Sequence, residues 1–338
     1  MMRVEIPVQL FEDDDCFAPL IKLILFFQDA RHEWVLSPLH VDTVSRFFER
    51  NFSASRAQTY RGIVEKASMA GFTWAPEEDR RPVLRIARGT LEEDIGDLHR
   101  PAVLVVENST YDWMFISTVA TLLGAEDVLR AREADLLDVR DGGGADGAVS
   151  QSLDQVRRFA RTKRVTLVID SDRFRPGERT KNHEGADHVA QEGGRTHVLE
   201  FRELENYVPN RVLARRKGPA EMARRLASLK KLTPEQRAHF DMKFGFRGKK
   251  GSSQANGKQR QAKNPRPGYS VPEQHGDLYE GVSEQDLVEL REGFGKDLSQ
   301  FFHEQFRAGG ITVKDLDGLG LGATEELRNM VDRIRDVI

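Results

Sequence analysis

Two uninterrupted apolar runs constrain the fold of this chain more than any other feature of its sequence. Residues 102–106 (AVLVV) and 165–169 (VTLVI) show no alternation of polar and apolar side chains, and carboxylates follow each run at once. Strands buried on both faces of a parallel sheet have this pattern, whereas strands with one solvated face alternate. We therefore expect a parallel sheet that is covered by helices on both sides.

The segments around these runs alternate between helical and strand-like patterns. Apolar residues have helical spacing over 111–124 and 148–162, and strand-like stretches occur over 134–141, before a glycine-rich turn, and from residue 196. Strands that alternate with helices are typical of βαβ units. We expect an α/β domain over residues 100–215.

The flanking segments have weaker patterns. Residues 1–99 contain amphipathic stretches followed by the strand-like sequence PVLRIARG, so we expect a small helical or α/β domain, with a winged helix able to read DNA as one form of it. Residues 216–338 are predicted to be mainly helical, with a basic flexible loop over 247–267.

Composition excludes several classes of protein. The chain has 338 residues, a single cysteine and no apolar run long enough to span a bilayer, so we expect a cytoplasmic protein without membrane contact or disulfides. A formal net charge of −3 argues against a protein whose whole surface coats nucleic acid. Residues 247–266 nevertheless form a local basic segment without a single acid.

Acidic residues follow three of the expected strands. Glu107 follows the first, Asp170 and Asp172 follow another, and Glu200, Glu203 and Glu205 follow the last. The carboxyl ends of parallel strands meet at one edge of a sheet, where like charges repel unless a cation neutralises them. Oxygen ligands suit Mg²⁺ or Mn²⁺, so we predict a metal site built on Glu107, Asp170 and Asp172. Asp138 and Asp141 are interpreted as turn formers.

These motifs resemble the Toprim family, and more closely the OLD-like nucleases within it. The resemblance rests on VLVVEN, on TLVIDSD about sixty residues later, on the turn VRDGGGADG between them, and on FRELENYVP, and it covers residues 100–212. The sequence departs from the family at Asn108, where glycine is usual, and at Phe174, where a third aspartate often stands.

The resemblance implies a Rossmann-like catalytic domain that hydrolyses phosphodiester bonds with two Mg²⁺ or Mn²⁺ ions. Asp170 and Asp172 would hold one ion, Glu107 would bind a second ion or act as general acid/base, and Glu203 and Glu205 would complete the site. A lysine would add positive charge near the scissile phosphate, and the candidates are Lys243, Lys249 and Lys250.

The basic segment would then contact the phosphate backbone, through Arg247, Lys249, Lys250, Lys258, Arg260 and Lys263. A solvated loop is the alternative for this segment. The histidines His183, His188 and His197 are interpreted as loop residues and not as ligands of a transition metal.

The chain contains no G-x-x-x-x-G-K-[ST] motif, and OLD-like nucleases commonly act with an ATPase. The resemblance therefore implies a separate ABC-like or SMC-like ATPase partner, a nucleic-acid substrate with DNA ahead of RNA, and a role in defence against phages or plasmids. The oligomeric state is open, with a homo-oligomer as one expectation. Two rival functions remain: a noncatalytic adaptor with a degenerate Toprim core, and a topoisomerase VI-like strand-passage subunit with Tyr60 as nucleophile.

Overall fold

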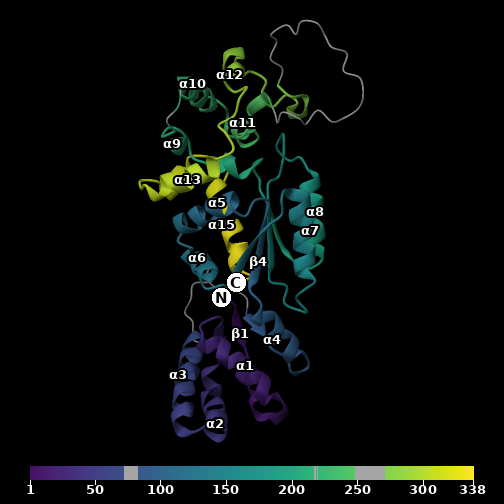
Figure 1. The fold of residues 1–338 in the computed structure, drawn as a ribbon, viewed down its shortest axis with the longest axis vertical. Helices are drawn as coiled ribbons and strands as arrows, with labels where there is room; N and C mark the ends of the chain where they lie inside the picture. Colours follow the sequence, from purple (N-terminus) through teal and green to yellow (C-terminus); the bar gives the residue numbers. More distant parts are fainter. Residues whose placement is uncertain (72–82, 217, 219, 248–270) are drawn as a thin grey trace.

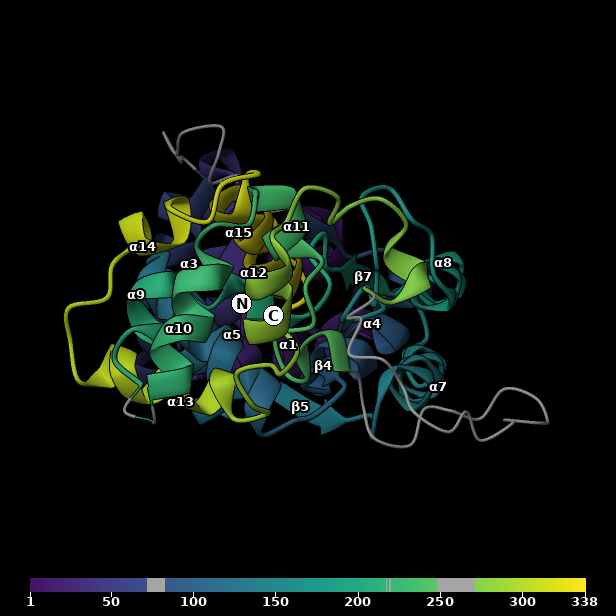
Figure 2. The same ribbon diagram turned by 90° about the horizontal axis from the view of Figure 1, so that it is seen from above.

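The computed structural model describes residues 1–71, 83–216, 218, 220–247 and 271–338, and it has the α/β class expected from the sequence. An N-terminal unit, a central sheet with its helices and a group of C-terminal helices follow one another along the longest axis (Figure 1). Both chain termini lie side by side where the N-terminal unit meets the central sheet (Figures 1 and 2). No helix in the described part of the chain is long and apolar enough to cross a bilayer.

The N-terminal unit is a three-stranded parallel sheet packed with helices. Its strands have the order β2-β1-β3, and its own core includes Val4, Leu20, Trp34 and Phe48. The elements are β1 (Arg3–Glu5), α1 (Phe17–Gln28), β2 (Glu33–Val35), α2 (Val41–Asn51), α3 (Ala54–Gly71), β3 (Val83–Arg85) and α4 (Leu91–His99).

The parallel pairing corrects the expectation of a winged helix for residues 1–99. A wing is an antiparallel hairpin, whereas β1 pairs in parallel with both β2 and β3. Parallel neighbours need a crossover connection, and here helices supply it. The described part of this unit is therefore α/β.

The central sheet contains four parallel strands in the order β5-β4-β6-β7. Both apolar runs identified in the sequence form its middle strands, and every residue of these two strands is buried. The strands are β4 (Ala102–Val106), β5 (Leu137–Asp141), β6 (Val165–Ile169) and β7 (Arg195–Val198).

Helices cover both faces of this sheet, as expected. One face packs against α7 (Ala145–Val156) and α8 (Lys181–Gln191), and the other packs against α5 (Tyr111–Leu122), α6 (Glu126–Glu133) and α15 (Ala323–Arg335) (Figure 2). Each face has its own apolar core.

Helix α8 occupies a segment that the sequence analysis assigned to a loop. His183 and His188 lie on this helix, and His197 lies on β7, so none of the three is a loop residue. Gly185 obscured the helical pattern but has a packing role, because a Cβ at this position would lie 2.7 Å from Val149 of α7. The missing side chain lets the two helices pack closely.

The C-terminal helices form two groups. Short helices lie beyond the carboxyl edge of the central sheet (Figure 1): α9 (Asn210–Leu213), α10 (Ala220–Leu229), α11 (Pro234–Ala238), α12 (Glu284–Glu289), α13 (Leu298–Arg307) and α14 (Val313–Asp317). The last helix, α15, instead returns along the sheet and buries Leu327, Met330 and Ile334 in the central core. The expected boundary at residue 216 therefore does not separate two cores, since α15 belongs to the central domain.

The N-terminal unit docks at the amino edge of the central sheet. The carboxylate of Asp97 on α4 accepts hydrogen bonds from the backbone N–H groups of Ala160, Arg161 and Thr162, at 2.7–2.8 Å. The buried guanidinium of Arg164, just before β6, donates to the carbonyl oxygens of Arg100 and Val337. Fixed polar contacts thus hold the N-terminal unit, the linker and the C-terminal helix together.

Candidate metal centre

The central strands deliver their acids to the point where the strand order reverses. The connection after β4 leads to β5 on one side, the connection after β6 leads to β7 on the other, and ligands commonly bind at such a switch point between two neighbouring strands. Glu107 follows β4 and Asp170 follows β6, and the Glu107 carboxylate accepts the backbone N–H of Asp170 at 3.1 Å. The sequence prediction that these two acids meet is confirmed.

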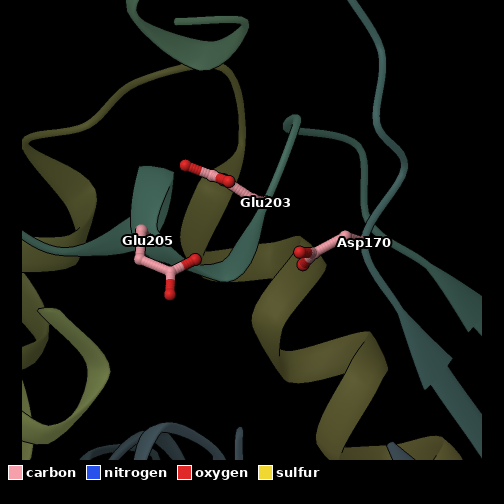
Figure 3. A group of neighbouring side chains, drawn as sticks. All are labelled: Asp170, Glu203 and Glu205. Atoms are coloured by element: carbon pink, nitrogen blue, oxygen red, sulfur yellow. The ribbon is translucent and has the colours of Figure 1, made fainter. Parts of the chain in front are cut away.

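Two further acids come from a short 3-10 helix, η6 (Leu204–Tyr207), and the residue before it. Asn206 is fully buried and fixes this turn: its side-chain oxygen accepts from the Glu203 N–H, and its amide donates to the carbonyls of Arg237 and Phe240. Glu203 and Glu205 are held on the same side as Asp170 (Figure 3). The motif ENY thus acts as the support for two carboxylates.

Tyr207 anchors the same turn to helix α15. Its hydroxyl donates to the Glu326 carboxylate and accepts the N–H of Phe201, and its ring stacks on the Phe201 ring at 4.4 Å. Glu326 also accepts the N–H of Glu200. The turn that carries the acids is therefore tied to both the sheet and the last helix.

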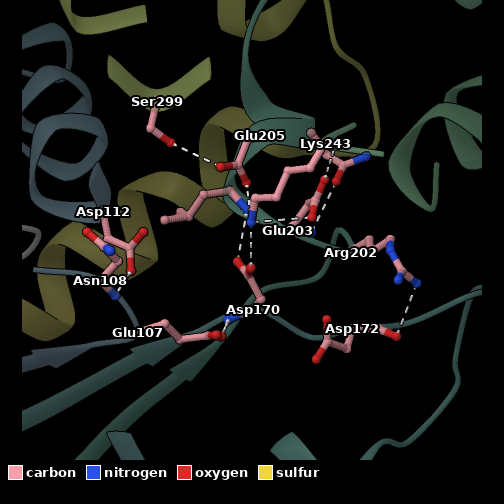
Figure 4. Close-up of polar contacts among 12 residues, drawn as sticks. Glu107, Asn108, Asp112, Asp170, Asp172, Arg202, Glu203, Glu205, Lys243 and Ser299 are labelled. Atoms are coloured by element: carbon pink, nitrogen blue, oxygen red, sulfur yellow. Dashed lines mark hydrogen bonds and ion pairs between the residues drawn. The ribbon is translucent and has the colours of Figure 1, made fainter. Parts of the chain in front are cut away.

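Three carboxylates and one ammonium group form the centre of the site, which we call the carboxylate cage: Asp170, Glu203 and Glu205 around Lys243. Ligand oxygens of the three acids lie within 4.8 Å of one another. The Lys243 ammonium lies 2.9 Å from Glu205, 3.4 Å from Asp170 and 3.4 Å from Glu203 (Figure 4). Of the lysines proposed from the sequence, Lys243 lies in the site, and Lys249 and Lys250 lie outside the described residues.

Burial and the charge of Lys243 dominate the electrostatics of the cage. Burial raises the pKa of Asp170, Glu203 and Glu205, and the nearby ammonium of Lys243 opposes the rise. Burial also disfavours the Lys243 ammonium, yet the three carboxylates hold the pKa of Lys243 well above its ordinary value. One positive charge is thus shared among three acids.

Two more acids border the cage with strongly perturbed pKa values. Burial, followed by repulsion from Asp170 and Asp172, raises the pKa of Glu107 to about 8. Burial and repulsion from Asp170 raise the pKa of Asp112, on α5, to about 7. The sequence analysis missed Asp112 because it considered acids at strand ends, and Asp112 lies in the first turn of helix α5. The available signal was its position five residues after Glu107.

Asp172 lies at the edge of this group. Its backbone has a left-handed conformation, with φ of 54°, and its carboxylate accepts a hydrogen bond from the buried Asn182 at 3.1 Å. Asn182 also donates to the Asp170 carbonyl at 2.9 Å, so one amide holds both ends of the DxD segment. Asp172 is not one of the three acids of the cage.

Of the two acids predicted as turn formers, Asp141 fits the prediction, whereas Asp138 does not: it lies within β5 and pairs with Arg140 at 2.7 Å. Asp141 accepts from Ser109 and from the Gly143 N–H, and these hydrogen bonds lower the pKa of its carboxylate. Asn108, where the family usually has glycine, accepts the N–H groups of Thr110 and Tyr111 and starts helix α5. This departure is therefore compatible with a tight turn after β4.

Glu200 does not join the cage. Its side chain is 66% exposed and pairs with Arg173 at 2.6 Å. Phe174 packs instead of ligating: its ring lies under the Arg202 guanidinium at 4.2 Å, and its carbonyl oxygen lies 2.9 Å from the His275 ring. Glu203 and Glu205 are thus the acids that accompany Asp170.

The predicted nucleic-acid contacts are largely untested by the structure. Arg247 ends the short helix η7 (Gly245–Arg247), four residues after Lys243. Lys249, Lys250, Lys258, Arg260 and Lys263 lie outside the described residues. The described chain resumes at residue 271, and His275 is buried against Phe174.

In comparisons with known proteins, no family model, no curated protein and no solved structure matches the chain.

Proposed function

We propose that this protein is a metal-dependent nuclease of the Toprim type that hydrolyses phosphodiester bonds, in DNA first and in RNA as the second choice. The proposal combines the motif resemblance over residues 100–212 with the placement of the acids at the switch point of the sheet.

The observation that carries the proposal is an excess of buried negative charge. Five buried or half-buried carboxylates gather at one edge of the sheet, and the exposed Asp172 lies at their rim. Among the described residues, the ammonium that contacts three of them is that of Lys243. The five acids are Glu107, Asp112, Asp170, Glu203 and Glu205. Acids with strongly perturbed pKa values, grouped in this way, are typical of functional sites.

The donor set fits Mg²⁺ or Mn²⁺, because all of its groups are hard carboxylate oxygens. Asp170, Glu203 and Glu205 would hold one ion, and Glu107, Asp112 and Asp172 border the place for a second. When bound, such ions activate water and stabilise the leaving oxygen of a phosphodiester. Glu107, with its raised pKa, is suited to hold or release a proton near neutral pH.

The composition of the basic segment favours nucleic acid as substrate. Residues 247–266 carry seven Lys or Arg residues and no acid, and such residues bind a phosphate backbone. Lys243, four residues before this segment, lies among the carboxylates. The ATPase partner and the role in anti-phage or anti-plasmid defence rest on the family resemblance.

A cleavage assay tests the proposal. Purified protein is incubated with supercoiled plasmid and with a structured RNA, in Mg²⁺, Mn²⁺ or EDTA, beside the double variant Asp170→Ala/Asp172→Ala. We expect metal-dependent cutting of the plasmid by the wild type and none by the variant. Equal inactivity of both proteins, with and without co-purified partners, would rule out catalysis.

A noncatalytic adaptor is the second candidate, and one observation favours it. Lys243 already neutralises part of the cage from within the chain, as a structural ion pair would. An adaptor needs no divalent ion, so unchanged melting temperature upon addition of Mn²⁺ would favour this function.

The place of Tyr60 gives the topoisomerase-like alternative no support within one chain. The Tyr60 ring stacks on Phe48 at 4.6 Å and belongs to the N-terminal unit. This unit docks at the amino edge of the central sheet, and strands of five residues, about 3.3 Å each, separate that edge from the carboxylates. Tyr60 therefore cannot reach the site of its own chain.

A further inference from the structure

We propose that the Lys243 ammonium is the resident counter-ion of the carboxylate cage, and that a divalent cation binds the cage only by displacing it. This inference rests on the proposed metal site and concerns how that site is loaded. It does not depend on whether the loaded protein cuts nucleic acid.

The dimensions of the cage allow one cation at a time. The ammonium already lies within 3.4 Å of all three carboxylates, whose ligand oxygens lie within 4.8 Å of one another. Oxygen ligands surround Mg²⁺ at roughly 2.0–2.1 Å, so an ion held by the same three acids needs the space that the ammonium fills. Because the ion and the ammonium would occupy the same space, and repel each other there, the cage does not hold both.

The backbone at Lys243 is fixed by its neighbours. Its N–H donates to Glu203, its carbonyl accepts from Gly295, and the preceding carbonyl of Met242 accepts from Phe294 at 2.7 Å. A Cβ on Gly293 would lie 2.4 Å from the Lys243 carbonyl carbon, so the two backbones are in direct contact. Loop movement is therefore not the way in which the cage is emptied.

Side-chain rotation remains as the route. The Lys243 side chain is 25% exposed, although its ammonium group contacts three buried acids. Rotation towards solvent would free the cage and keep the ammonium tethered beside it. The exchange replaces one charge by another, so the three acids are never left together without a cation. The competing lysine must also weaken the apparent affinity for metal.

Removal of the lysine charge tests the exchange directly. Mn²⁺ binding is measured by calorimetry for the wild type, Lys243→Met and the matched control Lys231→Met, since Lys231 pairs with Asp286 at a distant site. We expect Lys243→Met to bind Mn²⁺ at least about tenfold more tightly, because a competing charge is gone. The control variant should match the wild type. Melting curves in EDTA and in Mn²⁺ verify that each variant is folded.

A measurement on the wild type guards against a variant that does not fold. Lysine acetylation, quantified by mass spectrometry, should rise several-fold at Lys243 when Mg²⁺ is added and stay constant at Lys231. Acetylation of Lys243 that does not respond to bound Mg²⁺ would contradict the exchange.

The outcomes separate this inference from the nuclease proposal. Wild-type protein that cuts DNA with Mn²⁺, together with a Lys243→Met variant that binds Mn²⁺ no more tightly, overturns the exchange and leaves the nuclease intact. Tighter binding by the variant with no cutting by the wild type supports the exchange and removes the nuclease. Absence of Mn²⁺ binding in both proteins overturns both.

Discussion

Buried acids lie at both edges of the central sheet, and the two groups differ in how they are neutralised. At the amino edge, Asp97 accepts three backbone N–H groups, and Asp94 pairs with Arg161 at 2.9 Å and accepts from Thr90. At the carboxyl edge, the acids of the cage share the single ammonium of Lys243.

The difference separates structural acids from functional ones. At the junction, three backbone N–H groups satisfy Asp97, and Arg161 pairs with Asp94, although burial raises the pKa of Asp94. At the carboxyl edge, burial and then repulsion from Asp170 raise the pKa values of Glu107 and Asp112 to about 8 and about 7. An external cation would offset this repulsion.

The largest effect should follow a change in the cage itself. Asp170→Asn keeps the shape of the side chain but removes one charge, and we expect cleavage of plasmid DNA to fall at least about a hundredfold, as loss of a metal ligand exceeds outer-shell effects. Single-turnover cleavage rates in Mg²⁺ measure the loss. Retention of full activity would mean that Asp170 is structural, like Asp97.

A substitution at the junction between the N-terminal unit and the central sheet should lower the stability of the protein and leave its activity unchanged. Asp97→Ala leaves three N–H groups without their acceptor, and we expect the free energy of unfolding to fall by about 2–3 kcal/mol. Urea denaturation in EDTA and in Mn²⁺ provides the measurement. The loss should be the same with and without metal; a loss that Mn²⁺ repairs would mean that the two edges are coupled.

The pH dependence of stability should have the opposite sign from that of an ion-paired acid, whose pKa is lowered on folding. Burial, followed by repulsion from Asp170, raises the pKa of Glu107 from 4.5 to about 8, so the folded protein keeps a proton that the unfolded chain loses. In EDTA, stability should therefore decrease between about pH 5 and pH 8, by about 3–4 kcal/mol.

Replacement of the titrating group isolates its share of this slope. Glu107→Gln should flatten the decrease, and the remaining slope should reflect Asp112. Thermal unfolding at a series of pH values gives the comparison, with Asp141→Asn as a turn variant outside the cage. An unchanged slope in Glu107→Gln would contradict the assigned pKa.

The smallest effect should come from Glu200, an acid of the same edge outside the cage. Its pair with Arg173 is exposed, so Glu200→Gln should change stability by about 0.5 kcal/mol or less. Mn²⁺ affinity should equal that of the wild type. A clear loss of Mn²⁺ affinity would mean that Glu200 is a metal ligand and that the metal site extends beyond the cage.

Much of the central domain was predictable because its signals are local. The apolar runs gave β4 and β6, helical spacing gave α5 and α7, and strand ends placed Glu107 and Asp170 at one edge. Strand direction in the N-terminal unit was not predictable, since three-residue strands carry no signal of orientation. The sequence also did not show which element α15 packs against. An amphipathic pattern indicates that one face of a helix is buried, but it does not identify the surface that covers this face.

The choice among the later acids depended on tertiary contacts. Glu200, Glu203 and Glu205 look alike in sequence, and Asn206 separates them by fixing the turn through Arg237 and Phe240. Lys243 was named from its motif context, but its place among the three acids arises from backbone packing against residues 293–295. Such contacts join residues far apart in the chain and leave no local pattern.

The return of α15 to the central sheet has a consequence for synthesis on the ribosome. The N-terminal unit has its own core and is complete once residue 99 has emerged. One face of the central sheet, in contrast, is covered only in part, by α5 and α6, until residues 323–335 are made, and the Tyr207–Glu326 contact that anchors the acidic turn forms only then. A nascent chain that already carries all five acids therefore lacks the completed site until synthesis has nearly finished.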